Sequence, residues 1–528
     1  MAGNAEQLVA DVEARLRPLE VALARAWWEA STHASEEADR RKAEIDLQRR
    51  EVLADPAAFA AIREARSIGD CLDPLVRRQL DVLHDACAPH QVPDDLRRRL
   101  VELETDVDAT FTSFRGELAG ERVDDNAILE ILGSSDDAAL RQRAWEASKQ
   151  VGEAVADRVR ELARLRNEAA RSLGHRDHFA LALATGEMDE GRLFATLDEV
   201  DRATAGPFAR WKRQLDEALA ERFGCALDDL RPWHLDDPFF QDPPASGAVD
   251  LDPVFEGADL EALTVRTYDG IGLDVRDVLA RSDLYGRDGK NQHAFCIDID
   301  REGDVRVLCN VEPNERWMDT MLHEFGHAVY DGNLRRDVPW LLRSAAHALT
   351  TEGVAMLFGR LVRDPAWLAT VAGVASRDVD ALRDRLDTAR RAALLTFARW
   401  VLVVTHFERR LYTDPDADLD TLWWELVERF QRVRRPEGRH APDWAAKIHL
   451  AVVPVYYQNY LYGELVASQL DATLATRAGG IVDREAAGRF LAGELFGPAA
   501  TVRWDRLVED TTGGPLTATH LARQLVTP

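Results

Sequence analysis

Helical periodicity dominates the first two hundred residues and constrains the fold more than any other feature. In residues 8–31 and 140–173, apolar side chains recur three and four positions apart. Ala, Leu, Arg and Glu, which are good helix formers, make up most of these segments. The only strong β signal is a pair of short runs, residues 294–300 and 304–310, whose alternating apolar residues predict a hairpin. We therefore expect a mostly α fold with one small antiparallel β-sheet.

Charge and cysteine usage exclude several classes of protein. The 93 acidic and 66 basic residues give a net charge of −27, which repels nucleic-acid phosphates and anionic membrane surfaces. The five cysteines are widely spaced without a CxxC pair, so neither a disulfide framework nor a thiolate metal site is indicated. The first residues lack the basic and apolar segments of a secretory signal. We expect a cytoplasmic protein that binds neither nucleic acid nor membrane.

The sequence His323-Glu324-Phe325-Gly326-His327 is the strongest chemical signal in the chain. On a helix, histidines four residues apart project from the same face, where both can bind one Zn²⁺. The intervening Glu324 lies close enough to act as general base on a water at the metal without binding the metal itself. A chance occurrence of HExxH is the alternative, but Pro313-Asn314 begins a predicted helix that carries the motif and ends near Gly332.

A zinc site of this kind needs a third protein ligand, and two downstream residues are candidates. Glu352 lies 25 residues after His327, in a second apolar helix that can pack antiparallel to the first. A carboxylate buried there needs a metal or hydrogen-bond partner to offset its desolvation. His347 lies on a different face of that segment and is expected to be structural. We therefore predict one Zn²⁺ bound by His323, His327 and Glu352.

Four of the eight tyrosines fall within seven residues, at positions 456, 457, 460 and 462. A packed aromatic helix face is one interpretation of this cluster. Lys447 and His449 precede the tyrosines, however, so the segment gathers the hydrogen-bond donors that an amide-cleaving site requires. A lysine at position 447 is notable in itself, because only five of the 66 basic residues in this chain are lysine and the others are arginine.

Together these motifs resemble the helical gluzincin peptidases, which include angiotensin-converting enzyme, thimet oligopeptidase and neurolysin. The resemblance is specific from about residue 293 to residue 469 and weaker in residues 162–179. It implies a two-lobed helical peptidase with a deep central channel that admits short peptides and has its small sheet near the active site. We expect a single peptidase domain, residues 1–528, with one lobe over residues 1–240 and the zinc-site lobe over 241–528.

The same resemblance implies roles for individual residues. Tyr460 hydrogen-bonds the developing oxyanion, and Tyr457 contacts the C-terminal side of the substrate. His449 binds a substrate carbonyl, and His293-Ala294 lies on an edge strand that pairs with the bound peptide. Lys447, two residues before His449, corresponds to the lysine that binds the free C-terminal carboxylate in converting enzymes.

The chain departs from converting enzymes at two positions. Asn459 stands where chloride-activated members have an arginine, so chloride activation by that route is not expected. Met356 stands four residues after Glu352, where a carboxylate usually supports a metal ligand, so such support must come from elsewhere.

The sequence thus predicts a zinc metallopeptidase that releases dipeptides from peptide C-termini, with Glu324 as general base. An oligoendopeptidase of the thimet and neurolysin type, using the same zinc, is the first alternative. A non-catalytic peptide-binding protein and a zinc hydrolase of non-peptide amides are further alternatives.

Overall fold

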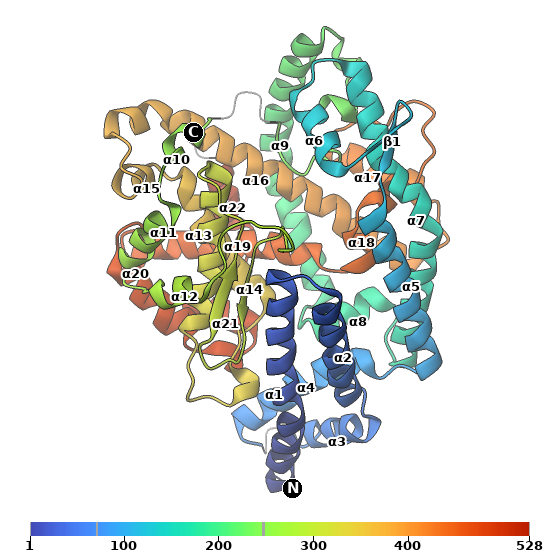
Figure 1. Cartoon of the computed structure of the whole chain (residues 1–528), viewed down its shortest axis with the longest axis vertical. Helices are drawn as coiled ribbons and strands as arrows, with labels where there is room; N and C mark the ends of the chain where they lie inside the picture. Colours follow the sequence, from blue (N-terminus) through green and yellow to red (C-terminus); the bar gives the residue numbers. More distant parts are fainter. Residues whose placement is uncertain (1, 70–71, 245–248, 527–528) are drawn as a thin grey trace. The chain divides into compact units, whose positions relative to one another are not determined.

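A computed structural model of the chain describes residues 2–69, 72–244 and 249–526 (Figure 1). These residues form a mostly α structure with two small antiparallel sheets, so the predicted fold class is confirmed. No helix in the described ranges combines the length and the apolar character needed to cross a bilayer.

The chain divides into two compact units, and it enters each of them more than once. Unit 1 contains residues 1–91, 250–384 and 462–521, and unit 2 contains residues 92–249, 385–461 and 522–528. Three of the five divisions fall inside helices, which are α16 (Ser376–Thr413), α19 (Tyr457–Arg477) and α22 (Thr519–Val526). These units differ from the predicted lobes, residues 1–240 and 241–528, because the N-terminal helices and the zinc-site segment fall in the same unit. The predicted channel stays a prediction.

Unit 1 begins with four helices that pack around their own apolar core. They are α1 (Ala2–Thr32), α2 (Glu36–Leu53), α3 (Pro56–Arg66) and α4 (Pro74–Cys87). Helices α1 and α2 lie side by side (Figure 1). Leu16, Ile62 and Leu80 are buried in this core, where Trp340 and Leu341 from a later segment join them.

The rest of unit 1 surrounds a helix pair and a hairpin. Its elements are α10 (Asp252–Phe255), α11 (Leu260–Asp269), α12 (Arg276–Arg281), β3 (Phe295–Asp298), β4 (Val305–Leu308), α13 (Glu315–Gly332), α14 (Ala348–Gly359), α15 (Pro365–Thr370), α20 (Glu485–Phe490) and α21 (Trp504–Thr512). Both strands of the hairpin pack against α13, which carries the HEFGH sequence. The predicted sheet near the candidate site is therefore present.

The hairpin is shorter than the sequence predicts. Strands β3 and β4 pair antiparallel, with Phe295 opposite Leu308 and Asp298 opposite Val305. Val305 and Val307 are buried as predicted. The strand assignments for residues 294, 299–300, 304 and 309–310 were wrong. At the closed end, Asp298 and Asp300 accept backbone N–H groups and form the turn. At the open end, the N–H of Cys309 donates to the carbonyl of Asp283 instead of to β3.

Unit 2 consists mainly of long helices. Its elements are α5 (Asp94–Ser113), β1 (Gly116–Leu118), β2 (Glu121–Val123), α6 (Asp125–Ser134), α7 (Ala138–Ser172), α8 (His178–Thr185), α9 (Glu190–Phe223), α17 (Leu419–Gln431) and α18 (His449–Val452), with most of α16. Aspartates at several helix starts accept backbone N–H groups, as Asp137 does for α7 and Asp189 for α9. The hairpin β1–β2 was not expected, because its three-residue strands are too short to show alternation.

Candidate metal centre

Helix α13 presents both histidines of the HEFGH sequence on one face. Asn314 caps the helix by accepting the backbone N–H of Trp317 at 2.9 Å. Met318, Met321, Leu322 and Phe325 are fully buried, so the apolar side of α13 is fixed in the core of unit 1. The rings of His323 and His327 then lie one turn apart, with their centroids separated by 5.0 Å.

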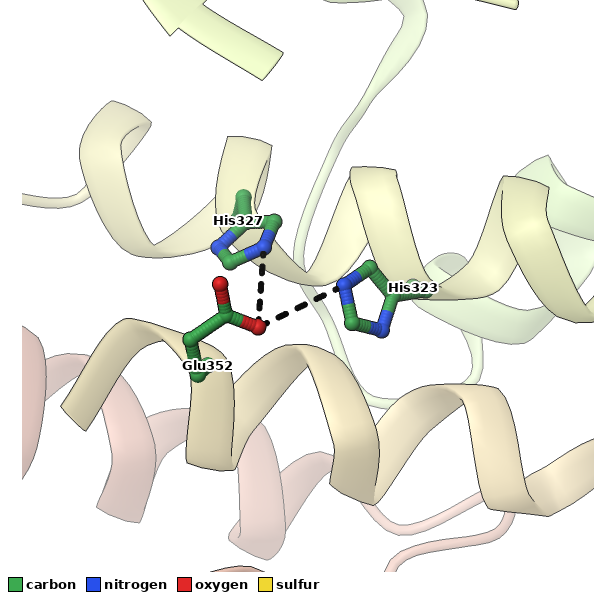
Figure 2. Close-up of side chains that lie close together, drawn as sticks. All are labelled: His323, His327 and Glu352. Atoms are coloured by element: carbon green, nitrogen blue, oxygen red, sulfur yellow. Dashed lines mark ion pairs between the residues drawn. The ribbon is translucent and has the colours of Figure 1, made fainter. Parts of the chain in front are cut away.

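Helix α14 packs antiparallel to α13 and supplies the third candidate ligand. His347 caps α14 by accepting the N–H of Leu349 through Nδ1 at 3.0 Å, which is the structural role expected of it. Glu352 projects from the first turns of α14 toward both histidines (Figure 2). Its Oε2 lies 3.7 Å from Nε2 of His323 and 3.9 Å from Nε2 of His327.

Glycines allow these helices to approach closely. A Cβ atom on Gly326 would lie 2.8 Å from Cα of Ala355, and one on Gly353 would lie 2.5 Å from Cγ1 of Val466. A Cβ on Gly463 of α19 would lie 3.1 Å from Cβ of Glu352. The glycine inside HEFGH is therefore needed for packing, since a side chain at Gly326 would push α14 and Glu352 away from the histidines.

The three ligand atoms have the chemistry and the spacing that a zinc ion requires. They lie within 4.8 Å of one another. Ligand atoms around a tetrahedral zinc at 2.0–2.1 Å are separated by about 3.4 Å, which is close to the 3.7 and 3.9 Å between Oε2 of Glu352 and the two Nε2 atoms. Burial lowers the pKa of His323 to about 4 and that of His327 to about 3. Both imidazoles are thus neutral at physiological pH and keep a lone pair for a metal.

Thr351 supports one of these ligands. Nδ1 of His327 lies 2.7 Å from the Thr351 hydroxyl oxygen. An Nδ1–H that donates to this hydroxyl leaves the Nε2 lone pair directed at Glu352. The sequence analysis did not identify Thr351, although its position directly before Glu352 is a signal that could have found it. The support that the sequence lacks at Met356 is supplied here by a hydroxyl.

Glu324 lies beside the ligand set in a different environment. It is buried, and burial together with repulsion from Glu352 raises its pKa to about 8. The backbone N–H of Cys296, in strand β3, donates to its carboxylate and partly opposes this shift. Burial also raises the pKa of Glu352, to about 7. A dication between these carboxylates would lower both pKa values and restore their charge.

The structure places His293 and Ala294 directly before β3, which begins at Phe295. The expectation that this pair lies on an edge strand is therefore wrong by one to two residues. His293 is exposed, and its N–H donates to the side chain of Asn291 at 2.9 Å. Among the described residues, β3 pairs only with β4, so its other edge has no strand partner.

The remaining predicted site residues, Lys447, His449, Tyr457 and Tyr460, lie in unit 2. The Lys447 side chain is enclosed by aromatic rings. Its Nζ donates to Oε1 of Gln241 at 2.9 Å. The same Nζ lies 5.4 Å from the ring centroid of Phe239, 5.5 Å from that of Trp400 and 5.6 Å from that of Tyr457. Burial lowers the pKa of Lys447 to about 8, so at neutral pH most molecules still carry a charged ammonium in this aromatic enclosure.

His449 and the tyrosines continue this cluster. The ring of His449 lies 4.8 Å from that of Tyr457, which lies 5.6 Å from that of Tyr460. Burial and the positive charge of Lys447 lower the pKa of His449 to about 4. Nδ1 of His449 is buried without a hydrogen-bond partner among the described residues. A buried polar atom in this condition can accept from, or donate to, a ligand.

Gln241 is the member of this cluster that the sequence analysis missed. It follows two phenylalanines in a proline-rich segment, where nothing in the local pattern distinguishes an amide that contacts Lys447. Only the tertiary contact with Lys447, 206 residues later, reveals it.

Two comparisons with known proteins bear on this site. Residues 2–200 match the family model described as angiotensin-converting enzyme, and residues 277–491 match that of peptidase family M3. Over 169 residues the chain is 24% identical to the "Inactive angiotensin-converting enzyme-related protein" of Caenorhabditis elegans. That match covers 31% of this chain and 18% of the relative. The predicted resemblance to helical gluzincin metallopeptidases of both kinds is thereby confirmed.

Proposed function

We propose that this chain is a zinc-dependent peptidase that hydrolyses short peptides and holds one Zn²⁺ with His323, His327 and Glu352. The observation that carries this proposal is the convergence of two neutral imidazoles and one carboxylate within 4.8 Å, beside the buried Glu324. The matches to two peptidase families support it independently. Zinc bound there would polarise the scissile carbonyl and make a water molecule more acidic.

Glu324 is the general base of this proposal. A carboxylate with a raised proton affinity accepts a proton from the attacking water more readily than an ordinary surface glutamate does. The same carboxyl group then delivers that proton to the departing amine. Its hydrogen bond from the Cys296 N–H fixes the carboxylate next to strand β3. We assign the unpaired edge of this strand, with His293 and Ala294 just before it, to the backbone of the substrate.

We further propose that the enzyme releases dipeptides from peptide C-termini. The cluster of Lys447 and Gln241 supports this mode, because an ammonium and an amide lined by aromatic rings suit a single carboxylate. Tyr457 would contact the same end of the substrate, and His449 would bind a backbone carbonyl through its unpaired Nδ1. The role of Tyr460, donation to the developing oxyanion, rests on the family resemblance.

Internal cleavage is the second candidate function. The match of residues 277–491 to peptidase family M3 favours it, because that match includes both the metal centre and the tyrosine segment. Loss of activity is a third possibility, since the relative from C. elegans is named inactive. The complete set of His323, Glu324, His327 and Glu352 in this chain argues against such a loss.

Mass spectrometry of the products from a small peptide panel tests the proposal. The panel pairs each peptide with a free C-terminus with its C-terminally amidated form, and the protein is loaded with one equivalent of zinc. We expect successive dipeptides from the free peptides and little cleavage of the amides. Rapid internal cleavage of the amides would replace the dipeptidase mode with endopeptidase activity. No cleavage of any peptide by the zinc-loaded protein would contradict the proposed function.

A further inference from the structure

Unit 2 contains a pocket of about 950 Å³ that none of the catalytic assignments uses. Helix α9 forms one wall of it and contributes Arg210, Lys212 and Arg213. The segment that follows α17 contributes Arg432, Arg434 and Arg435. Arg231 completes the basic lining. The volume lies in the upper part of the range typical of small-molecule sites, about 300–1,000 Å³.

The charge of this lining is opposite to that of the whole chain. Seven basic side chains line the pocket with three acidic ones, Asp216, Asp228 and Glu428. Arg213 and Arg231 also pair with Glu217 and Glu437 outside the lining, which leaves a net charge of +2. His234 also lines the pocket, but burial lowers its pKa and keeps it neutral. The chain as a whole carries −27. A concave site with a locally reversed charge attracts anions that the rest of the surface repels.

The acidic residues neutralise only part of the basic lining. Lys212 is buried and pairs with Asp216, and Arg434 pairs with Asp228 at 2.5 Å. Glu428 accepts the backbone N–H of Arg435 at 3.0 Å.

Two guanidinium groups of the pocket remain available to a ligand. In the described parts of the chain, the side chains of Arg210 and Arg432 make neither an ion pair nor a hydrogen bond.

Arg432 occupies a backbone position at which an arginine is unfavourable. It follows the last turn of α17 with φ 54° and ψ 36°, in the left-handed region that helix ends usually fill with glycine. A side chain with a Cβ atom is strained in this region, which glycine adopts freely. Its positive charge and that of Arg434 also disfavour the charged form of Lys212 and lower the pKa of that lysine, after the larger effect of burial. An anion bound among these three groups would relieve their mutual repulsion.

We propose that this pocket binds a small compound with several linked phosphates, either an inorganic polyphosphate or the phosphate chain of a nucleotide. Guanidinium groups match phosphate oxygens in a bidentate geometry, and the pocket offers six of them around one buried ammonium. Leu227, which is 46% exposed, adds an apolar portion to the wall, on which a nucleoside could pack. This binding site is independent of the proposed peptidase activity.

Isothermal titration calorimetry of the full chain with inorganic triphosphate tests the proposal. We expect one saturable site whose Kd rises at least fivefold in Arg210→Ala and in Arg432→Gly, and at least twentyfold in the double variant. Glycine favours the left-handed conformation, so Arg432→Gly removes the charge without endangering the fold, and its Tm should equal or exceed that of the wild type. Arg143→Ala is the matched control, because Arg143 is an exposed helical arginine of α7 outside the pocket, and its Kd should change less than twofold.

The same titration with ATP and with hexaglutamate identifies the ligand class. Tighter binding of ATP than of triphosphate would assign the pocket to nucleotides, and weaker binding would assign it to free polyphosphate; both results support a phosphate site. Absence of saturable triphosphate binding would overturn the proposal. The proposal would also be overturned if Arg143→Ala weakened triphosphate binding as much as the pocket variants do, or if hexaglutamate bound as tightly as triphosphate. Either result would indicate unspecific attraction of anions.

Discussion

Nδ1 of His327 lies 2.7 Å from the hydroxyl oxygen of Thr351, the residue directly before Glu352. One turn of α14 therefore both supplies a candidate metal ligand and orients another. This contact leaves Nε2 of His327 directed into the site, where Oε2 of Glu352 lies 3.9 Å away.

Removal of this hydroxyl should weaken metal binding without removing a ligand. We expect Thr351→Val to raise the Kd for zinc by about 10- to 100-fold, as is typical when the partner of a metal-binding histidine is lost. Thr351→Ser keeps the hydroxyl and should stay close to the wild type. Competition with a chromogenic zinc chelator measures both affinities. Equal zinc affinity of the valine and serine variants would show that the contact does not orient His327.

Gly326 should be indispensable for the approach of α13 and α14. A methyl group there would lie 2.8 Å from the backbone of Ala355, and overpacking of this kind costs about 1–3 kcal/mol. We expect Gly326→Ala to lower the free energy of urea unfolding by that amount and to weaken zinc binding. Gly133→Ala is the matched control, because a methyl group on Gly133 in α6 meets nothing within 4 Å. That control should gain about 0.5–1 kcal/mol; a Gly326→Ala variant of equal stability would contradict the packing account.

Replacement of Lys447 should weaken the binding of peptides with a free C-terminal carboxylate more than that of amidated peptides. A charge-assisted hydrogen bond contributes about 1.5–3 kcal/mol, so Lys447→Ala should raise KM about 10- to 100-fold for peptides with a free carboxylate. Amidated peptides provide the internal control, and their kcat/KM should stay nearly constant. Steady-state kinetics on paired substrates measures the difference. A similar loss for both members of each pair would remove Lys447 from carboxylate recognition.

Glu408 should make the protein less stable as the pH rises. It is 1% exposed, its Oε1 accepts the N–H of Val455 at 2.7 Å, and burial raises its pKa to about 8 from an ordinary 4.5. Between these two values the folded protein holds a proton that the unfolded chain has released, so this residue lowers the free energy of unfolding as the pH rises.

The variant Glu408→Gln cannot ionise and retains an acceptor for the Val455 N–H. It should therefore flatten the decline in stability from about pH 5 to pH 8, measured by urea unfolding. Glu425→Gln, an exposed change in α17, is the control and should leave the slope unchanged. A Glu408→Gln slope identical to that of the wild type would contradict the assignment.

Local sequence patterns were sufficient to predict the helical class and the convergence of three candidate ligands. The spacing of His323 and His327 specifies one helix face, and the apolar helix that contains Glu352 has only a few ways to cover that face. The hairpin and the N-terminus of α13 follow from alternation and from the capping residue Asn314. Each of these features is encoded within about 30 consecutive residues.

Contacts between distant segments could not be predicted in this way. Gln241 meets Lys447 across 206 positions, and Gly463 allows α19 to approach Glu352 across 111 positions. The discontinuous units arise from the same cause, because residues 1–91 and residues 250–384 belong to one compact unit although 158 residues separate them in the sequence. Periodicity reports which face of a helix is buried but not which segment covers it.

The Glu324→Gln variant tests the central claim most directly. Zinc content and the hydrolysis of one free-carboxylate peptide are measured on the same preparations of variant and wild type. We expect both proteins to retain one zinc, because Glu324 is not a ligand, and we expect kcat to fall by about 10²–10⁴-fold in the variant with the loss of the general base. A variant that retains its zinc and hydrolyses the peptide at the wild-type rate would contradict the account.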